Sequence, residues 1–98
     1  MEIIKQKNGN ALDISLVGRL DTTTAPQLDE VVTGELEGVE TLNFDFAQLE
    51  YISSAGLRVL LSAQKIMNKQ GSMIIKNVND DINEVFEITG FSDILTIE

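Results

Sequence analysis

The fold of this chain is decided by one stretch, Tyr51-Ile52-Ser53-Ser54-Ala55-Gly56-Leu57-Arg58-Val59-Leu60-Leu61. It places two consecutive hydroxyl groups where the pattern predicts that a strand-like run gives way to a helix. A side-chain oxygen at such a position accepts one of the free backbone N–H groups of the first helical turn. Ser53 is therefore predicted to be the N-cap, which leaves Ser54 with no capping role.

The helix that follows has a polar side and an apolar side. Steps of three or four residues place five polar side chains on one stripe, Ser54, Arg58, Ser62, Lys65 and Lys69. The apolar side is suited to lying on a sheet, and it consists of Leu57, Leu60, Leu61 and Ile66 with Val59, Ala63 and Met67 beside them. Ser54 is thus expected to face water, and Ser53 to lie nearer the buried side.

A phosphate on Ser54 would lie among free N–H groups at the positive end of the helix dipole, where an anion is accommodated. Phosphorylation adds about −1.5 to −2 charges and three acceptor oxygens at neutral pH. From this chemistry alone, the Ser53-Ser54 pair is either a simple cap or a regulated anion site.

The composition predicts one compact domain spanning residues 1–98, without disulfides. Cysteine and histidine are both absent, which excludes thiolate metal sites, a cysteine nucleophile and the commonest general base. Asp21 and Asp45 could pair as hydrolase carboxylates do, but no histidine or ligand cluster accompanies them. We therefore expect no metal, no cofactor and no hydrolase site built from these two carboxylates.

The net charge of −9 argues against binding to nucleic acid or to anionic lipid, since both need a basic surface. The first residues lack the pattern of a secretory signal, and no apolar run reaches the roughly 20 residues that span a bilayer. A cytoplasmic protein with a protein partner, not inserted in a membrane, is the expectation.

The first half of the chain alternates strand and helix patterns. Residues 2–7 and 11–18 read as antiparallel strands around an Asn-Gly turn. A helix is then expected, with Thr24 as N-cap, Gln27 closing a capping box, and Gly38 ending it. The next strand is predicted over residues 42–46, followed by a connection to Ser53.

The second half continues the same alternation. The helix that begins at Ser53 is expected to end near residues 70–71, before a strand over 73–75. A further helix begins at Asn79 or Asp80 and closes at Gly90, and residues 94–97 can form a last strand. This order predicts an α/β fold with a mixed, mostly parallel sheet and three to four helices. The loops 18–24 and 47–54 then lie at the same sheet edge and should be neighbours.

These segments resemble the STAS domain family, particularly its free-standing bacterial anti-sigma factor antagonists. The resemblance covers nearly the whole chain, and its motifs are matched by Gly18-Arg19-Leu20-Asp21-Thr22-Thr23-Thr24, Leu42-Asn43-Phe44-Asp45-Phe46, Ser53-Ser54-Ala55-Gly56-Leu57 and Phe86-Glu87-Ile88-Thr89-Gly90-Phe91. The resemblance implies that Ser54 is phosphorylated by a serine kinase that is also the anti-sigma factor. Unphosphorylated protein would bind this kinase and free a sigma factor, and a 2C-type serine phosphatase would reset the switch.

Two departures from the family motif bear on this interpretation. Ser53 stands where the family has Asp, and Ala55 stands where it has a second hydroxyl residue. The missing Asp motivates an alternative, a STAS scaffold or accessory subunit of a transporter or signalling complex without a phosphoserine cycle. It also makes Ser53 a second, less favoured candidate for the acceptor.

The partner-binding surface is predicted from the two matching loops. It consists of Asp21, Thr22, Thr23, Thr24, Ser53, Ala55, Gly56 and Arg58. For Asp21 and the three threonines, turn formation and capping are the competing interpretation. For Arg58 the competing interpretation is a solvated helix charge.

Overall fold

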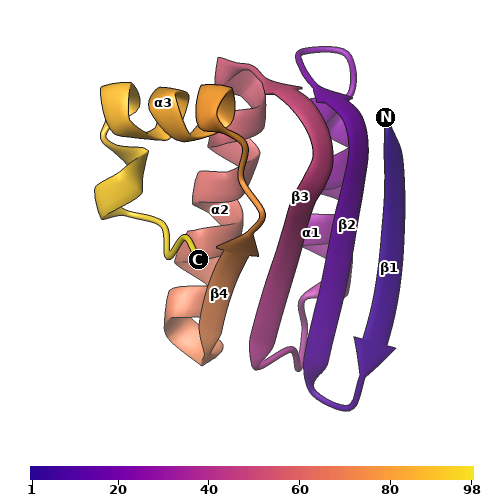
Figure 1. Cartoon of the computed structure of the whole chain (residues 1–98). Coiled ribbons are helices and arrows are strands. Elements are labelled where there is room, and N and C mark those ends of the chain that lie inside the picture. Colours follow the sequence, from indigo (N-terminus) through magenta and orange to yellow (C-terminus); the bar gives the residue numbers. More distant parts are fainter.

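The computed structural model describes all residues from Met1 to Glu98. Four strands and three α-helices follow one another along the chain (Figure 1). Their bounds are β1 Glu2–Asn8, β2 Ala11–Leu20, α1 Ala25–Glu35, β3 Thr41–Ile52, α2 Ser54–Gln70, β4 Ser72–Lys76 and α3 Asp80–Thr89. A short 3-10 turn, η1 (Phe91–Asp93), follows α3.

The strands form one mixed sheet in the order β1-β2-β3-β4. β1 and β2 pair antiparallel around the tight turn at Gly9, which has a φ of 60° that glycine adopts without strain. β2, β3 and β4 are parallel, and α1 and α2 make the crossovers between them. The predicted α/β fold with an antiparallel hairpin and an otherwise parallel sheet is thus confirmed.

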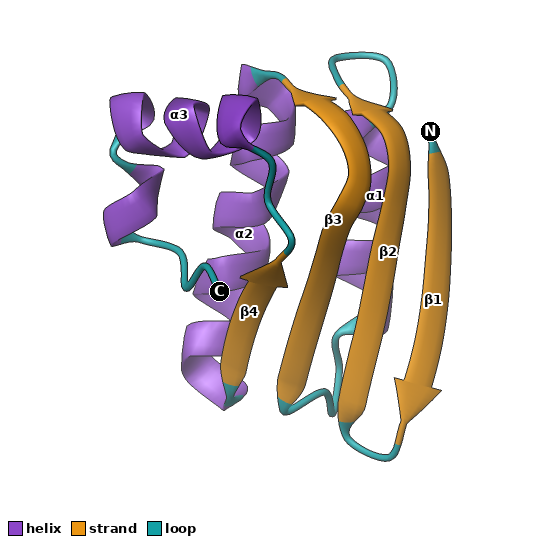
Figure 2. Ribbon diagram, in the orientation of Figure 1, coloured by secondary structure: helices purple, strands orange, loops and turns teal.

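Both crossover helices cover the same face of the sheet, and the opposite face carries no helix (Figure 2). Side chains of β2 alternate between buried and half-exposed positions, as expected when only one face is covered. The covered face holds a single apolar core that includes Leu20, Phe44 and Leu60. Burial of this core is the main force holding α2 in place on the sheet.

Strand β3 is longer than the sequence predicts, because it continues through residues 47–52, which we expected to form a connection. Its pairing with β2 shifts register between Ser15 and Val17 and again between Gly18 and Arg19. Each shift leaves one extra residue on β3, so the alternation of buried and exposed residues breaks down after Phe46. Without alternation, the pattern of this segment does not look like a strand.

The predicted strand over residues 94–97 does not form. Phe91–Asp93 instead make a 3-10 turn, and Ile97 alone bridges Ile75 of β4. The turn directs the chain so that only its last residues reach the sheet, where the N–H of Glu98 donates to the carbonyl of Ile75 at 2.9 Å. Helix α3 begins as predicted, with Asn79 as N-cap accepting the N–H of Ile82 at 2.8 Å, and it ends at Gly90.

Candidate functional site

The carboxyl ends of β2 and β3 bring together the two loops that the sequence analysis singled out. The backbone N–H of Ser53 donates to the carbonyl of Leu20 at 2.9 Å, which joins the end of one strand to the start of α2. Gly56, in the first turn of α2, packs against the Leu20 side chain. The predicted proximity of the two loops is therefore confirmed.

Asp21 organises the loop between β2 and α1. Its carboxylate accepts the N–H of Thr23 at 3.0 Å and that of Thr24 at 3.1 Å, and also the hydroxyl of Thr23 at 2.7 Å. The hydroxyl of Thr23, with the two N–H groups, holds the pKa of Asp21 below its ordinary value of 3.8. The Asp21 carboxylate thus closes the turn that precedes α1, and no side chain caps the helix itself.

Thr24 is not the side-chain cap of α1, so the predicted capping box is wrong. The Thr24 hydroxyl donates to the carbonyl of Arg19 at 2.8 Å and accepts the N–H of Asp21 at 2.8 Å. These bonds turn the hydroxyl back toward the end of β2, away from the N–H groups of the helix. Thr22 and Thr23 are exposed to solvent beside it.

Ser53 precedes α2 but makes no capping hydrogen bond, which contradicts the prediction that its side chain caps the helix. Its Oγ is buried and has no hydrogen-bond partner. The backbone of Ser53 is nevertheless well used, since its N–H binds Leu20 and its carbonyl accepts the N–H of Leu57 at 3.0 Å. Ser53 therefore fixes the start of α2 through its main chain alone.

Ser54 is the first residue of α2, and its side chain is exposed as predicted. The other members of the predicted polar stripe are also exposed, namely Arg58, Ser62, Lys65 and Lys69. Helix α2 contains no acidic residue, so this exposed side carries only positive charge. A negative group on Ser54 would lie at a helix N-terminus, one turn from Arg58.

The remaining predicted site residues occupy three different environments. Ala55 is half-buried and Gly56 is buried. A Cβ at residue 56 would lie 2.6 Å from Cγ of Leu20, so this glycine is required by close packing. Arg58 lies on the solvent side of α2, so the site combines a packed floor with an exposed charged rim.

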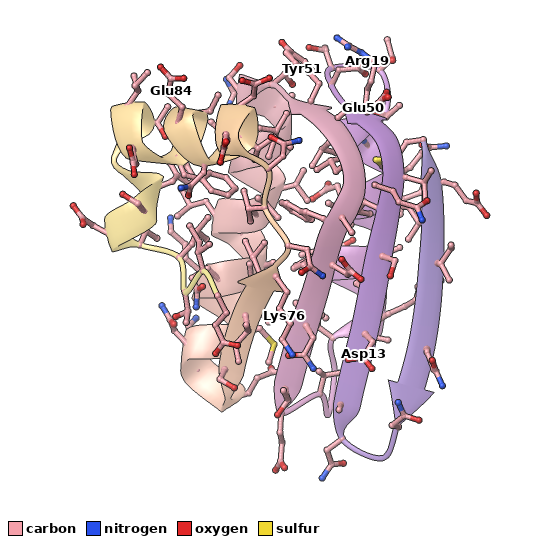
Figure 3. The ribbon with its side chains drawn as sticks, in the orientation of Figure 1. Asp13, Arg19, Glu50, Tyr51, Lys76 and Glu84 are labelled. Atoms are coloured by element: carbon pink, nitrogen blue, oxygen red, sulfur yellow. The ribbon has the colours of Figure 1, made fainter.

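Arg19 and Tyr51 were not among the predicted site residues, although the structure places them at the same edge. Arg19 and Tyr51 pair in register across β2 and β3, and the Arg19 guanidinium lies 4.2 Å from the Tyr51 ring centroid (Figure 3). Arg19 Nε also lies 3.9 Å from a carboxylate oxygen of Asp21. Tyr51 is 41% exposed, which makes it the large aromatic surface beside the two loops.

No periodic signal identified Tyr51, because the two extra residues of β3 break the alternation after Phe46. No group of three or more acidic side chains is placed so that it could hold a metal ion. None of the helices combines the length and apolar character that crossing a lipid bilayer requires.

Comparison with known proteins gives one consistent result. The profile of the STAS domain matches residues 2–98. The anti-sigma-B factor antagonist of Listeria monocytogenes is 34% identical over 98 residues, covering 97% of this chain and 85% of that protein.

Two solved structures share the fold over nearly the whole chain. An anti-sigma factor antagonist from Mycobacterium paratuberculosis has a TM-score of 0.87 at 18% identity, covering 98% of this chain and 83% of that one. The Bacillus cell fate determinant SpoIIAA, solved in its phosphorylated form, has a TM-score of 0.78 at 19% identity, covering 99% and 91%.

Proposed function

Because the chain belongs to the STAS domain family, we propose that it is an anti-sigma factor antagonist switched by phosphorylation of Ser54. In this proposal the unphosphorylated protein binds an anti-sigma factor that is also a serine kinase, and a sigma factor is released. Phosphorylation of Ser54 ends the binding. The single observation that carries the assignment of the acceptor is that Ser54 is an exposed hydroxyl at the first residue of α2.

Accessibility favours Ser54 over Ser53 as the acceptor. A kinase must align the acceptor oxygen with the terminal phosphate of ATP, so the oxygen has to be reachable from solvent. The Oγ of Ser53 is buried, whereas the side chain of Ser54 lies on the exposed stripe of α2. Ser53 could be phosphorylated only after the start of α2 had opened.

A phosphate on Ser54 is compatible with the folded state. The N-terminal N–H groups of α2 and the guanidinium of Arg58 both favour a negative group at this position. The Ser54 side chain also lies outside the apolar core that holds the domain together. The added charge would therefore change the surface that a partner meets and leave the fold intact.

The surface around Ser54 is proposed to be the partner-binding surface. It combines Asp21 and Thr22 to Thr24 of one loop with Ser53, Ala55, Gly56 and Arg58 of α2. Arg19 and Tyr51 extend it, because their stacked side chains lie at the same end of the sheet. Tyrosine and arginine are among the residue types that contribute most to the binding energy of protein interfaces.

In this proposal the chain is a binder and a substrate, and it is not an enzyme. The kinase supplies the phosphoryl transfer, and a 2C-type serine phosphatase removes the phosphate. Because sigma factors act on transcription inside the cell, the proposal also implies a cytoplasmic protein. No cofactor and no nucleic acid enter this cycle.

The test is to incubate the protein with ATP and the serine kinase encoded nearest to its gene, and to map the phosphate by mass spectrometry. We expect one phosphate, on Ser54. Ser54→Ala should remove it, and Ser53→Ala is the matched control that should retain it. Unchanged phosphorylation of Ser54→Ala would contradict the assignment.

A binding measurement tests the switch itself. Titration of the kinase should give similar affinities for wild type and Ser54→Ala, and a lower affinity for Ser54→Asp, whose carboxylate mimics part of the phosphate charge. Equal affinities for all three would argue against a charge switch. Recovery of a transport ATPase in place of a kinase in a pull-down would favour the accessory-subunit alternative.

A further inference from the structure

A groove runs between α1 and α2 on the outer side of the helical layer. Its volume is about 350 Å³, and it is lined by Thr22, Ala25, Pro26, Asp29, Ala55, Arg58, Val59 and Ser62. Ala25 and Val59 form part of an apolar floor, together with Pro26 and the half-buried Ala55. At one end the groove reaches Ala55, the residue next to Ser54, so it is continuous with the proposed partner-binding surface.

The two walls of this groove carry opposite charge. Helix α1 contains Asp29, Glu30 and Glu35 and no basic residue, while α2 contains Arg58, Lys65 and Lys69 and no acidic residue. Asp29 and Arg58 are the charged residues that line the groove itself, and both are exposed.

Asp29 and Arg58 form no ion pair within the domain. The ion pairs of the structure join Lys5 to Glu35 and Arg19 to Asp21, and neither of them links α1 to α2. Asp29 and Arg58 therefore flank the apolar floor from opposite sides with their charges available. This arrangement complements a partner that places an apolar side chain on the floor, a basic group beside Asp29 and an acidic group beside Arg58.

We infer that this groove receives one apolar side chain of the anti-sigma partner, with a basic group of the partner on Asp29 and an acidic group on Arg58. The inference rests on the proposed function and specifies the chemistry of the partner. The groove lies at the small end of the usual range of binding pockets, and its volume has room for an apolar side chain together with the polar groups beside it. Opposite charges on the two walls would fix the orientation in which the partner docks.

The groove also links docking to the phosphorylated residue. Arg58 is four residues after Ser54 on α2, so the two side chains are neighbours on the helix surface. A phosphate on Ser54 competes for the Arg58 guanidinium, and the partner then loses the positive wall of the groove. Phosphorylation would thus weaken docking by a mechanism in addition to direct repulsion.

The experiment measures binding of the kinase that phosphorylates Ser54, by isothermal titration calorimetry, to two variants with the same charge change. Asp29→Lys reverses the acidic wall, whereas Glu30→Lys makes the same change on α1 outside the groove. We expect Asp29→Lys to weaken binding about tenfold or more and Glu30→Lys to change it by no more than about twofold. Equal effects would reveal a general influence of net charge and would overturn the inference.

The apolar floor is tested by filling it. Ala55→Leu places a larger side chain in the groove, and Ala47→Leu makes the same change at an exposed position of β3 away from it. Only Ala55→Leu should weaken binding, while thermal melting shows that both variants fold. If wild type is phosphorylated on Ser54 and both Asp29→Lys and Ala55→Leu bind as wild type does, the groove inference is wrong while the proposed function stands. If no kinase binds wild type, the proposed function fails and the inference falls with it.

Discussion

Gly56 of α2 lies so close to Leu20 of β2 that a Cβ at residue 56 would be 2.6 Å from Cγ of Leu20. Leu20 is fully buried, so its branch point has no room to move away. The same hypothetical Cβ would lie 2.9 Å from Cγ1 of Ile52. This contact holds the first turn of α2 against the ends of two strands, and it thereby sets where Ser54 emerges.

The first prediction follows from this contact. Gly56→Ala should destabilise the domain by about 1–3 kcal/mol, because overpacking a rigid core outweighs the gain in helix propensity. For a domain of this size, the loss corresponds to roughly 4–8 °C of melting temperature per kcal/mol. Gly34→Ala is the matched control in α1, where nothing lies within 4 Å, and it should stabilise the protein. Melting temperatures that rise for both variants would contradict the close contact.

The second prediction concerns the buried hydroxyl of Ser53, which has no hydrogen-bond partner. A capping serine loses about 1 kcal/mol on replacement by alanine, but here no such bond is present to lose. Ser53→Ala should therefore leave the free energy of unfolding within about 0.5 kcal/mol of wild type, or raise it slightly. Urea denaturation measures the difference. A loss near 1 kcal/mol would show that Ser53 caps α2 in solution.

The hairpin could be predicted from its Asn-Gly turn, and the crossovers and α2 could be predicted because their apolar residues recur with a regular period. The end of β3 could not, since two extra residues between Asp45 and Tyr51 erase the period of two. At this irregularity the carboxylate of Asp45 accepts the N–H of Ala47 at 2.9 Å, a contact that no spacing rule predicts. The exposed Tyr51, and its stack with Arg19, were missed for the same reason.

The capping hydroxyls show a second limit of the sequence. Spacing identified Thr24 and Ser53 as N-caps, yet neither side chain bonds to its helix. The Thr24 hydroxyl donates to the carbonyl of Arg19, and the Asp21 carboxylate binds the N–H of Thr23 in the turn before α1. Which of several nearby donors and acceptors pair depends on the path of the loop, and spacing in the sequence does not give that path. The exposure of Ser54, in contrast, follows directly from helical periodicity.

The third prediction is a pH dependence at Asp21. Its pKa is lowered in the folded state, so its carboxylate adds stability that is present above the ordinary value of 3.8 and is lost as pH falls through the lower folded value. Asp21→Asn keeps an acceptor oxygen but removes the charge. The stability difference between wild type and Asp21→Asn should therefore be larger at pH 7 than at about pH 2, as measured by urea denaturation. A difference that does not change with pH would contradict this role of the carboxylate.

The fourth prediction concerns the pair formed by Ser54 and Arg58 once Ser54 is phosphorylated. The second ionisation of phosphoserine has a pKa of about 6, and a neighbouring cation favours the dianion and lowers this pKa. In Arg58→Ala the phosphate should titrate a few tenths of a unit higher than in wild type, as expected for an exposed pair. Phosphorus NMR across the pH range measures it. Lys65→Ala removes the same charge from the same exposed stripe, but 11 residues from Ser54 in a 17-residue helix. It should therefore titrate like wild type, and an equal shift in both variants would show that Arg58 does not contact the phosphate.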